Sequence, residues 1–269
     1  MNLQPSPAPT RVCPACGSDH RRAKPQYSRD PWQVVGCAAC GFTYLANPVD
    51  YASLVDDFAW EKTTKTERAY RRKSRPIVDG LSQATRWRLK LFRRNKAQVF
   101  LNVFGPGRVL DIGCGGGGAL PPPIEPYGVE ISKALAASAD QHMRARGGYC
   151  VHAAAIDGAK TFADGFFQGV LVHSFLEHEV NPLPLLQECA RVLAPGGKVF
   201  VRVPNFASVN RRVMGGKWCG FRHPDHVNYF TPTSLADMGA KAGFRLKIRN
   251  WPTLAFDDNI KGVLVKQAG

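Results

Sequence analysis

The sequence predicts an α/β protein in which a small cysteine-rich module precedes a mainly parallel sheet. Beyond residue 105, apolar β-branched runs alternate with helical stretches, which is the pattern of βαβ units. One of these runs, residues 109–112, leads directly into the glycine-rich turn 113–118. Near the N-terminus, two Cys-x-x-Cys pairs, each followed by glycine, are separated by residues 17–36. Each of these observations predicts one part of the architecture.

Length and composition allow a folded, water-exposed protein. The chain has 269 residues, 44% of them hydrophobic and 21% charged, which suits one large domain or a compact pair with a packed core. No apolar run is long enough to span a membrane. The first residues show no charged, apolar and small-residue order of a secretory signal, so we expect a cytoplasmic protein.

The formal net charge of +15 is concentrated in one segment. Residues 60–100 carry 13 basic and 3 acidic side chains, whereas the rest of the chain has a net charge of only +5. The segment reads as mostly helical from about residue 56 to 104. It could contact RNA phosphates, act as a lid over an anionic acceptor, or be a solvated helix face. No run of interleaved aromatic residues accompanies it, which weakens the RNA interpretation.

These patterns divide the chain into four parts. Residues 1–10 are expected to be a disordered tail, residues 11–48 a cysteine module, residues 49–104 a basic helical connector or lid, and residues 105–269 the α/β core.

The cysteine module has the spacing of a metal site. Its two motifs place Cys13 beside Cys16, and Cys37 beside Cys40, with a glycine after each pair. Four thiolates match tetrahedral Zn²⁺ and leave no open coordination position, so the predicted role is structural. The alternative is that the four are unligated core cysteines.

The core is expected to contain seven strands and three clear helices. The strands are predicted at residues 108–112, 127–131, 149–152, 169–173, 198–203, 245–251 and 261–266. The helices are predicted at residues 132–146, 182–193 and 233–242. Ser132 and Thr233 are expected N-caps, and Gly147 and Gly243 are expected helix stops.

The glycine turn and the next strand end predict a nucleotide-type cofactor site. Glycines let the backbone approach a cofactor closely, and Glu130 at the end of the following strand can hold two ribose hydroxyls. The glycine spacing alone fits a dinucleotide as well as other adenosyl cofactors. Three consecutive prolines at residues 121–123 cannot lie inside a helix, so we expect the first helix after the turn to be very short or replaced by a loop.

The surrounding motifs resemble the class I S-adenosylmethionine (SAM)-dependent methyltransferases. The resemblance lies in VLDIGCGGG at 109–117, GVE at 128–130, VLVHSFLEH at 170–178 and LAPGGKVFV at 193–201. The cysteine pairs and the late segment HVNYFTPTSL at 226–235 are similar to a bacterial subfamily with an N-terminal zinc ribbon. The resemblance implies a Rossmann-like seven-stranded methyltransferase sheet, with SAM held by Asp111, Gly113, Gly115, Gly117, Glu130, Ala154 and His173.

The same resemblance implies a small-molecule or glycan-precursor acceptor. Imidazole is well suited to take a proton near neutral pH, and His226 is the first candidate for the base, followed by His178. Tyr229, in the same loop as His226, is the third candidate catalytic residue. Either histidine could instead have a structural role. Two other functions stay open: an RNA methyltransferase that uses the ribbon and basic segment, and a degenerate SAM-binding module without catalysis.

Overall fold

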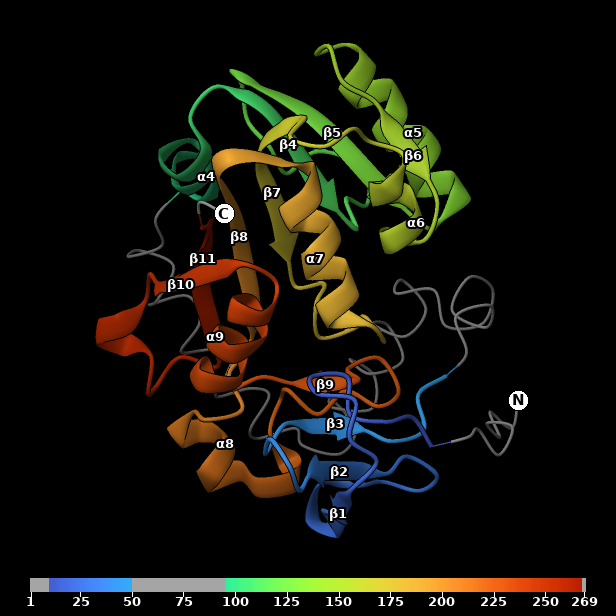
Figure 1. Cartoon of the computed structure of the whole chain (residues 1–269), viewed down its shortest axis with the longest axis vertical. Helices are drawn as coiled ribbons and strands as arrows, with labels where there is room; N and C mark the ends of the chain where they lie inside the picture. The colour runs from blue at the N-terminus through green and yellow to red at the C-terminus, as the bar shows by residue number, and fades with distance from the viewer. Residues whose placement is uncertain (1–9, 50–94, 268–269) are drawn as a thin grey trace, which may run out of the picture.

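The computed structural model of the chain describes residues 10–49 and 95–267, and Figure 1 shows its elements. The main sheet has seven strands in the spatial order β10-β11-β8-β7-β4-β5-β6, which confirms the predicted strand number and α/β class. The strands are β4 (Gly107–Ile112), β5 (Ile124–Glu130), β6 (Cys150–His152), β7 (Phe167–His173), β8 (Leu193–Pro204), β10 (Phe244–Ile248) and β11 (Asn259–Lys266).

The sheet is mixed, and its strand order reverses at β4. Strands β8, β7, β4, β5 and β6 pair in parallel, whereas β11 pairs antiparallel with both β8 and β10. The chain leaves β4 toward β5 on one side, while β7 pairs with β4 on the other. Ligands of open α/β sheets bind at such a switch point, beyond the carboxyl ends of the strands.

Helices cover both faces of the sheet (Figure 1). On one face, Leu110 and Ile112 share a hydrophobic cluster with residues of α6, α7 and α9. On the other face, Val109 packs with Phe100 of α4, and α5 contacts β5 and β6. These helices are α4 (Lys96–Phe104), α5 (Lys133–Arg144), α6 (Ala155–Lys160), α7 (Pro182–Val192) and α9 (Pro232–Lys241).

The N-terminal module forms a second, four-stranded sheet that includes a strand from the core segment. Its order is β1-β2-β3-β9, with β1 (Arg21–Ala23), β2 (Val34–Cys37) and β3 (Thr43–Leu45) from the module and β9 (Asn228–Tyr229) from residues far along the chain. In Figure 1 this sheet lies beyond the end toward which the β7 arrow points. The remaining elements are η1 (Pro25–Tyr27), α8 (Val209–Met214), η2 (Gly215–Lys217) and η3 (Trp251–Thr253).

Two local predictions have different outcomes. The loop between β4 and β5 contains no helix, as the three prolines predict. The N-cap of α9 is Thr231 and not Thr233, so that prediction is wrong. Pro232 occupies the first helical turn, and the Thr231 side chain accepts a hydrogen bond from the Ser234 amide in a capping box.

Part of the connector lies outside the described residues. The predicted helical character is confirmed for Lys96–Phe104, but residues 50–94, which carry most of the basic side chains, are not described, nor are residues 1–9 of the predicted tail. Among the described helices, none is long and apolar enough to cross a membrane.

Candidate active site

The glycine turn after β4 is shaped by backbone conformations that favour glycine. Gly113, Gly115 and Gly117 have φ angles of 68°, 55° and 80°. A Cβ on Gly113 would lie 2.3 Å from the ring of Phe175, so the loop after β7 packs directly on this turn. A Cβ on Gly115 would meet nothing within 4 Å, which leaves the backbone there open to a ligand.

Glu130 holds the turn from the end of β5. Its carboxylate accepts hydrogen bonds from the Gly115 amide at 2.8 Å and from the Ser132 amide at 2.9 Å. A carboxylate offers about four lone-pair positions, so two stay available for ribose hydroxyls. The sequence-predicted pair of a glycine turn and an acidic strand end is therefore brought together.

The proline-containing loop replaces a helix through two compensating contacts. Leu120 is buried in the hydrophobic cluster between α4 and the sheet, where it covers apolar surface. Arg146 donates to the carbonyls of Leu120 and Ile124, each at 2.6 Å. This loop has no helix N-terminus to offer a cofactor, but its open glycine backbone and the Glu130 carboxylate fit an adenosyl group such as SAM.

The other predicted cofactor residues are placed differently. Asp111 is buried in β4, where burial and the Glu130 charge raise its pKa to about 8. His173 ends β7 and packs against Phe100 and Phe200, and burial followed by Arg202 lowers its pKa to about 4. Ala154 is the N-cap residue of α6, directly after β6. All of these residues lie at or near the carboxyl ends of adjacent strands, the edge at which β4 meets the glycine turn.

The two candidate histidines come together from segments 48 positions apart. The rings of His178, in the loop after β7, and His226, before β9, have centroids 4.7 Å apart and are nearly perpendicular. His178 Nδ1 lies 2.9 Å from the Asp225 carbonyl, and His226 Nδ1 lies 2.8 Å from the Gly220 carbonyl. Burial, and then the Arg222 charge, lower the pKa of His178 to about 4. The two rings therefore lie edge to face beyond the carboxyl end of β7, each held by a backbone carbonyl.

Tyr229 is part of the support of this loop. It is buried, its hydroxyl lies 3.5 Å from His223 Nδ1, and burial raises its pKa. In β9 it pairs with Thr43 of the cysteine module. Tyr229 therefore packs in a hydrophobic cluster with Phe206, Phe221 and Trp32 of the cysteine module.

Asn228 and Arg11 join the cysteine module to the histidine loops. The Asn228 amide donates to the carbonyls of Leu176 at 3.0 Å and Glu179 at 2.6 Å, and accepts from Arg11 at 3.0 Å. Arg11 also donates to the carbonyls of Val180 and Val227. Sequence reasoning missed both roles, because no local pattern reveals contacts between residues 49 to 217 positions apart.

The four cysteines of the module converge on one point. The Cys13 and Cys40 sulfurs lie 3.6 Å apart, as do those of Cys16 and Cys37, and all four sulfurs lie within 4.8 Å of one another. A tetrahedral Zn²⁺ with bonds of 2.3 Å requires sulfurs about 3.8 Å apart. All eight cysteines of the chain are free thiols, so this donor set fits zinc.

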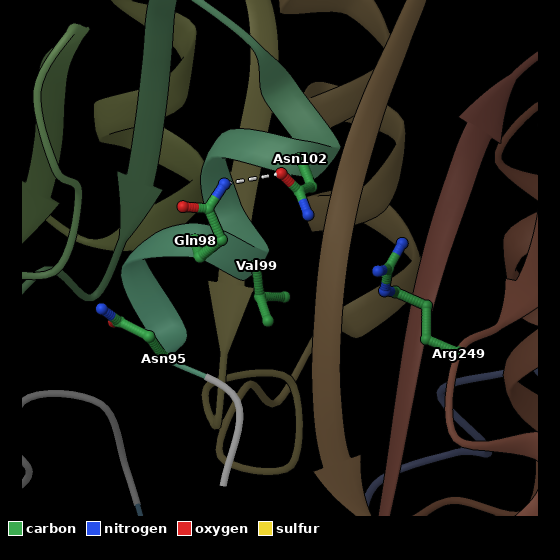
Figure 2. Close-up of a pocket in the computed structure, with 5 residues that line it drawn as sticks. All are labelled: Asn95, Gln98, Val99, Asn102 and Arg249. Atoms are coloured by element: carbon green, nitrogen blue, oxygen red, sulfur yellow. Dashed lines mark hydrogen bonds between the residues drawn. The ribbon is translucent and has the colours of Figure 1, made fainter.

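A separate hollow lies beside α4 (Figure 2). It has a volume of about 420 Å³ and is lined by Asn95, Gln98, Val99 and Asn102 of the helix segment and by Arg249. None of the glycine-turn residues or the paired histidines lines it. The hollow is therefore not part of the candidate active site.

Comparison with known proteins identifies relatives of the core. The methyltransferase-domain family matches residues 84–247. The chain is 32% identical over 157 residues to a ubiquinone biosynthesis O-methyltransferase of Parvibaculum lavamentivorans, covering 52% of this chain and 59% of that protein. It is 33% identical over 153 residues to the Cereibacter sphaeroides protein of the same description, with coverages of 51% and 59%. The chain thus spans less than two thirds of these relatives.

Solved structures share the fold at low sequence identity. A SAM-dependent methyltransferase from Thermotoga maritima, described as a possible histamine N-methyltransferase, is 22% identical with a TM-score of 0.50. The alignment covers 70% of this chain and 96% of that one. A putative O-methyltransferase from Nostoc punctiforme is also 22% identical with a TM-score of 0.50, over 63% and 54% of the two chains.

Proposed function

Because the chain belongs to the class I SAM-dependent methyltransferases, we propose that it methylates a small-molecule acceptor held beside the histidine pair. The observation that carries this proposal is the open, Glu130-braced glycine turn, with Phe175 of the histidine loop packed on it. The cofactor and the acceptor would therefore occupy neighbouring positions at the carboxyl ends of β4, β5 and β7.

The proposed transfer has simple chemical requirements. Bound SAM supplies a methyl group on a sulfonium; the acceptor lone pair forms the new bond to carbon while the sulfur keeps the electron pair of the broken bond. A hydroxyl acceptor must also lose its proton. We assign assistance of that step to His226 first and to His178 second, and assign Tyr229 to support of the loop.

The acceptor class is a finer part of the proposal. The similar curated proteins are described as O-methyltransferases, which favours an oxygen acceptor. We propose a hydroxyl of a glycan precursor as the first class, with a hydroxylated aromatic ring as the second. The proposed setting is the cytoplasm, where reduced Cys13, Cys16, Cys37 and Cys40 can hold a structural zinc ion.

Transfer of radiolabel from SAM tests the function directly. Tritiated SAM is incubated with the protein and, in separate reactions, nucleotide-linked sugars, catechol-type phenols and total RNA. Label in a sugar or phenol fraction supports the proposal. Label in RNA, with binding that weakens steeply as salt rises, would replace the acceptor class by RNA. SAM binding by calorimetry without transfer to any fraction would favour a cofactor-binding module without catalysis.

A further inference from the structure

We propose that Glu177, His178 and His226 form a second metal site, which takes a divalent first-row transition ion such as Zn²⁺. One carboxylate oxygen and one nitrogen from each ring lie within 4.8 Å of one another. Glu177 and His178 follow β7, and His226 precedes β9. The amide of Val227 donates to the Glu177 carbonyl at 2.8 Å, which ties the two segments together at this point.

The two rings are held in the orientation of metal ligands. Each Nδ1 lies within 2.9 Å of a backbone carbonyl, that of Asp225 for His178 and that of Gly220 for His226. A carbonyl oxygen only accepts hydrogen bonds, so each Nδ1 carries the proton and Nε2 has the lone pair. Metal-bound histidines characteristically donate a hydrogen bond from their second ring nitrogen in this way, which fixes the tautomer and the direction of the ring.

Glu177 supplies a second observation, independent of the ring orientations, that points to a bound cation. Its side chain is 2% exposed, and Oε2 has no hydrogen-bond partner among the residues that the structure describes. A buried carboxylate oxygen without a partner destabilises the folded chain, unless a cation satisfies it. Two arginines lie near enough to act on Glu177 through charge, but Arg202 donates to Ser174 and Arg222 donates to Asp225 at 3.3 Å.

The donor set selects the class of ion. Two imidazoles and a carboxylate suit Zn²⁺, Fe²⁺ or Co²⁺ more than Mg²⁺ or Ca²⁺, which prefer oxygen ligands. Three protein ligands leave a coordination position open, unlike the four cysteines of the module. Metal binding at Glu177, His178 and His226 does not depend on the proposed function. The role of that metal does rest on it, and with the ion bound the two rings act as ligands and no longer as bases: an acceptor hydroxyl at the open position would release its proton to solvent more easily.

Metal content of the full chain tests the site. Protein freed of metal by chelation is loaded with Co²⁺ and desalted, and its cobalt content is measured. We expect about two ions per chain in the wild type, one for each site. The first should give thiolate-to-cobalt charge-transfer absorption, and the second only ligand-field absorption. Glu177→Gln should hold about one ion and keep the thiolate absorption, because the cysteine site is unchanged.

A matched control uses the neighbouring buried carboxylate. Glu179 is also 2% exposed, and it accepts a hydrogen bond from the Asn181 amide. Glu179→Gln should therefore keep the second ion. If Glu177→Gln does not fold, as judged by circular dichroism, His178→Gln replaces it. This variant removes a different ligand and should likewise hold about one ion and keep the thiolate absorption.

The outcomes separate this inference from the proposed function. A single ion in wild-type protein with thiolate absorption, or an unchanged second ion in folded Glu177→Gln and His178→Gln, would overturn the second site. Calorimetry with SAM is run on the same samples. Two ions with no SAM binding would support the metal site and contradict the methyltransferase function. SAM-dependent transfer by protein that holds only the cysteine-site ion would support the methyltransferase function and contradict the second metal site.

Discussion

Asn228 bonds both to Arg11 of the cysteine module and to the loop that carries His178, so its removal has a calculable effect. Asn228→Ala deletes two neutral hydrogen bonds, to Leu176 and Glu179, and one from the charged Arg11. Neutral bonds contribute about 0.5–1.5 kcal/mol each and bonds to charged groups about 1.5–3 kcal/mol. The variant should therefore lose about 3–5 kcal/mol of unfolding free energy, because the carbonyls it leaves behind are also unpaired.

The assay is urea denaturation at equilibrium, followed by far-UV circular dichroism, which the helices of the core dominate, and by cobalt–thiolate absorption of the cysteine site. In the wild type both probes should report one transition, because β3 and β9 share a sheet. In Asn228→Ala the cysteine-site transition should move to lower urea than the core transition. A stability loss below about 1 kcal/mol, with coincident transitions, would refute the reasoning.

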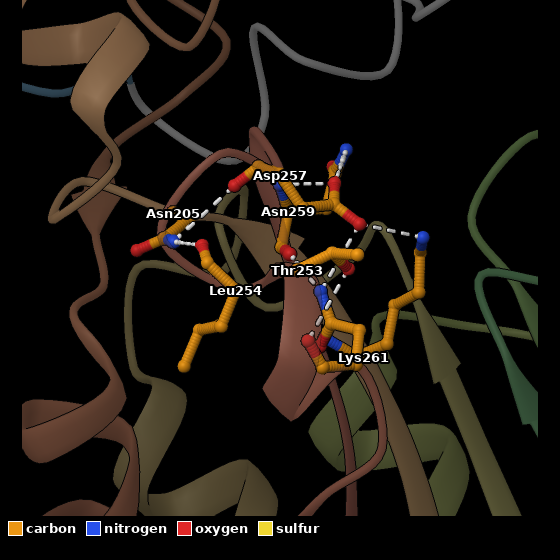
Figure 3. A network of polar contacts seen from close by, with 7 residues as sticks. Asn205, Thr253, Leu254, Asp257, Asn259 and Lys261 are labelled. Carbon is orange, nitrogen blue, oxygen red and sulfur yellow. Dashed lines mark hydrogen bonds and ion pairs between the residues drawn. The ribbon is translucent and has the colours of Figure 1, made fainter. Parts of the chain in front are cut away.

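A similar buried amide in the core provides the control (Figure 3). Asn205 donates to the carbonyls of Leu254 at 2.8 Å and Asp257 at 3.2 Å, and it accepts from the Ala207 amide. Asn205→Ala should lower stability by a similar or smaller amount, because no charged donor is involved. Its two probes should stay coincident, since these contacts lie within the core. Separated transitions in this variant would mean that the probes do not isolate the module.

Three further predictions concern the cofactor turn, a buried acid and the cysteine site. Glu130→Ala should weaken SAM binding in calorimetry about 10- to 100-fold through lost hydrogen bonds, whereas Glu125→Ala should not; equal affinities would remove Glu130 from the site. The pKa of Asp111 is raised to about 8, so the folded chain keeps a proton that the unfolded chain releases above about pH 4, and stability falls as pH rises between these values. Asp111→Asn lacks this loss, so its stability relative to wild type should grow from pH 4 to 8; a constant difference in thermal unfolding would contradict the assignment. Chelation of the cysteine-site metal, or Cys37→Ser, should lower the melting temperature and increase hydrogen exchange at residues 226–229, and unchanged exchange there would argue against coupling to the loop.

The sequence predicted elements that have a local signal. Strand periodicity located all seven strands of the main sheet, and the prolines at 121–123 predicted the missing helix. The signal for Thr231 is also local, since proline follows it and Ser234 completes a capping box, whereas Thr233 lies inside the first turn of the helix.

The assembly of the site depends on contacts that no local pattern encodes. Glu177 adjoins His178 in a recognised motif, yet only the folded chain shows that its Oε2 is buried without a hydrogen-bond partner among the described residues. Likewise, β9 is two residues long and pairs with β3 across more than 180 positions of sequence. Such a short strand has no periodicity to detect, so its pairing follows from tertiary contacts alone.

The shared sheet changes what the cysteine module is expected to do. A zinc ribbon tethered only by a linker would stabilise itself and leave the core unaffected. Here β3 pairs with the strand that follows His226 by two residues, and Arg11 donates to the carbonyls of Val180 and Val227, one in each histidine loop. We therefore expect metal binding at the four cysteines to stabilise the loop that carries His226 as well, because β3 of the module pairs directly with β9. If the four cysteines bind a metal, its loss should therefore disorder the loop at residues 226–229 before it unfolds the main sheet.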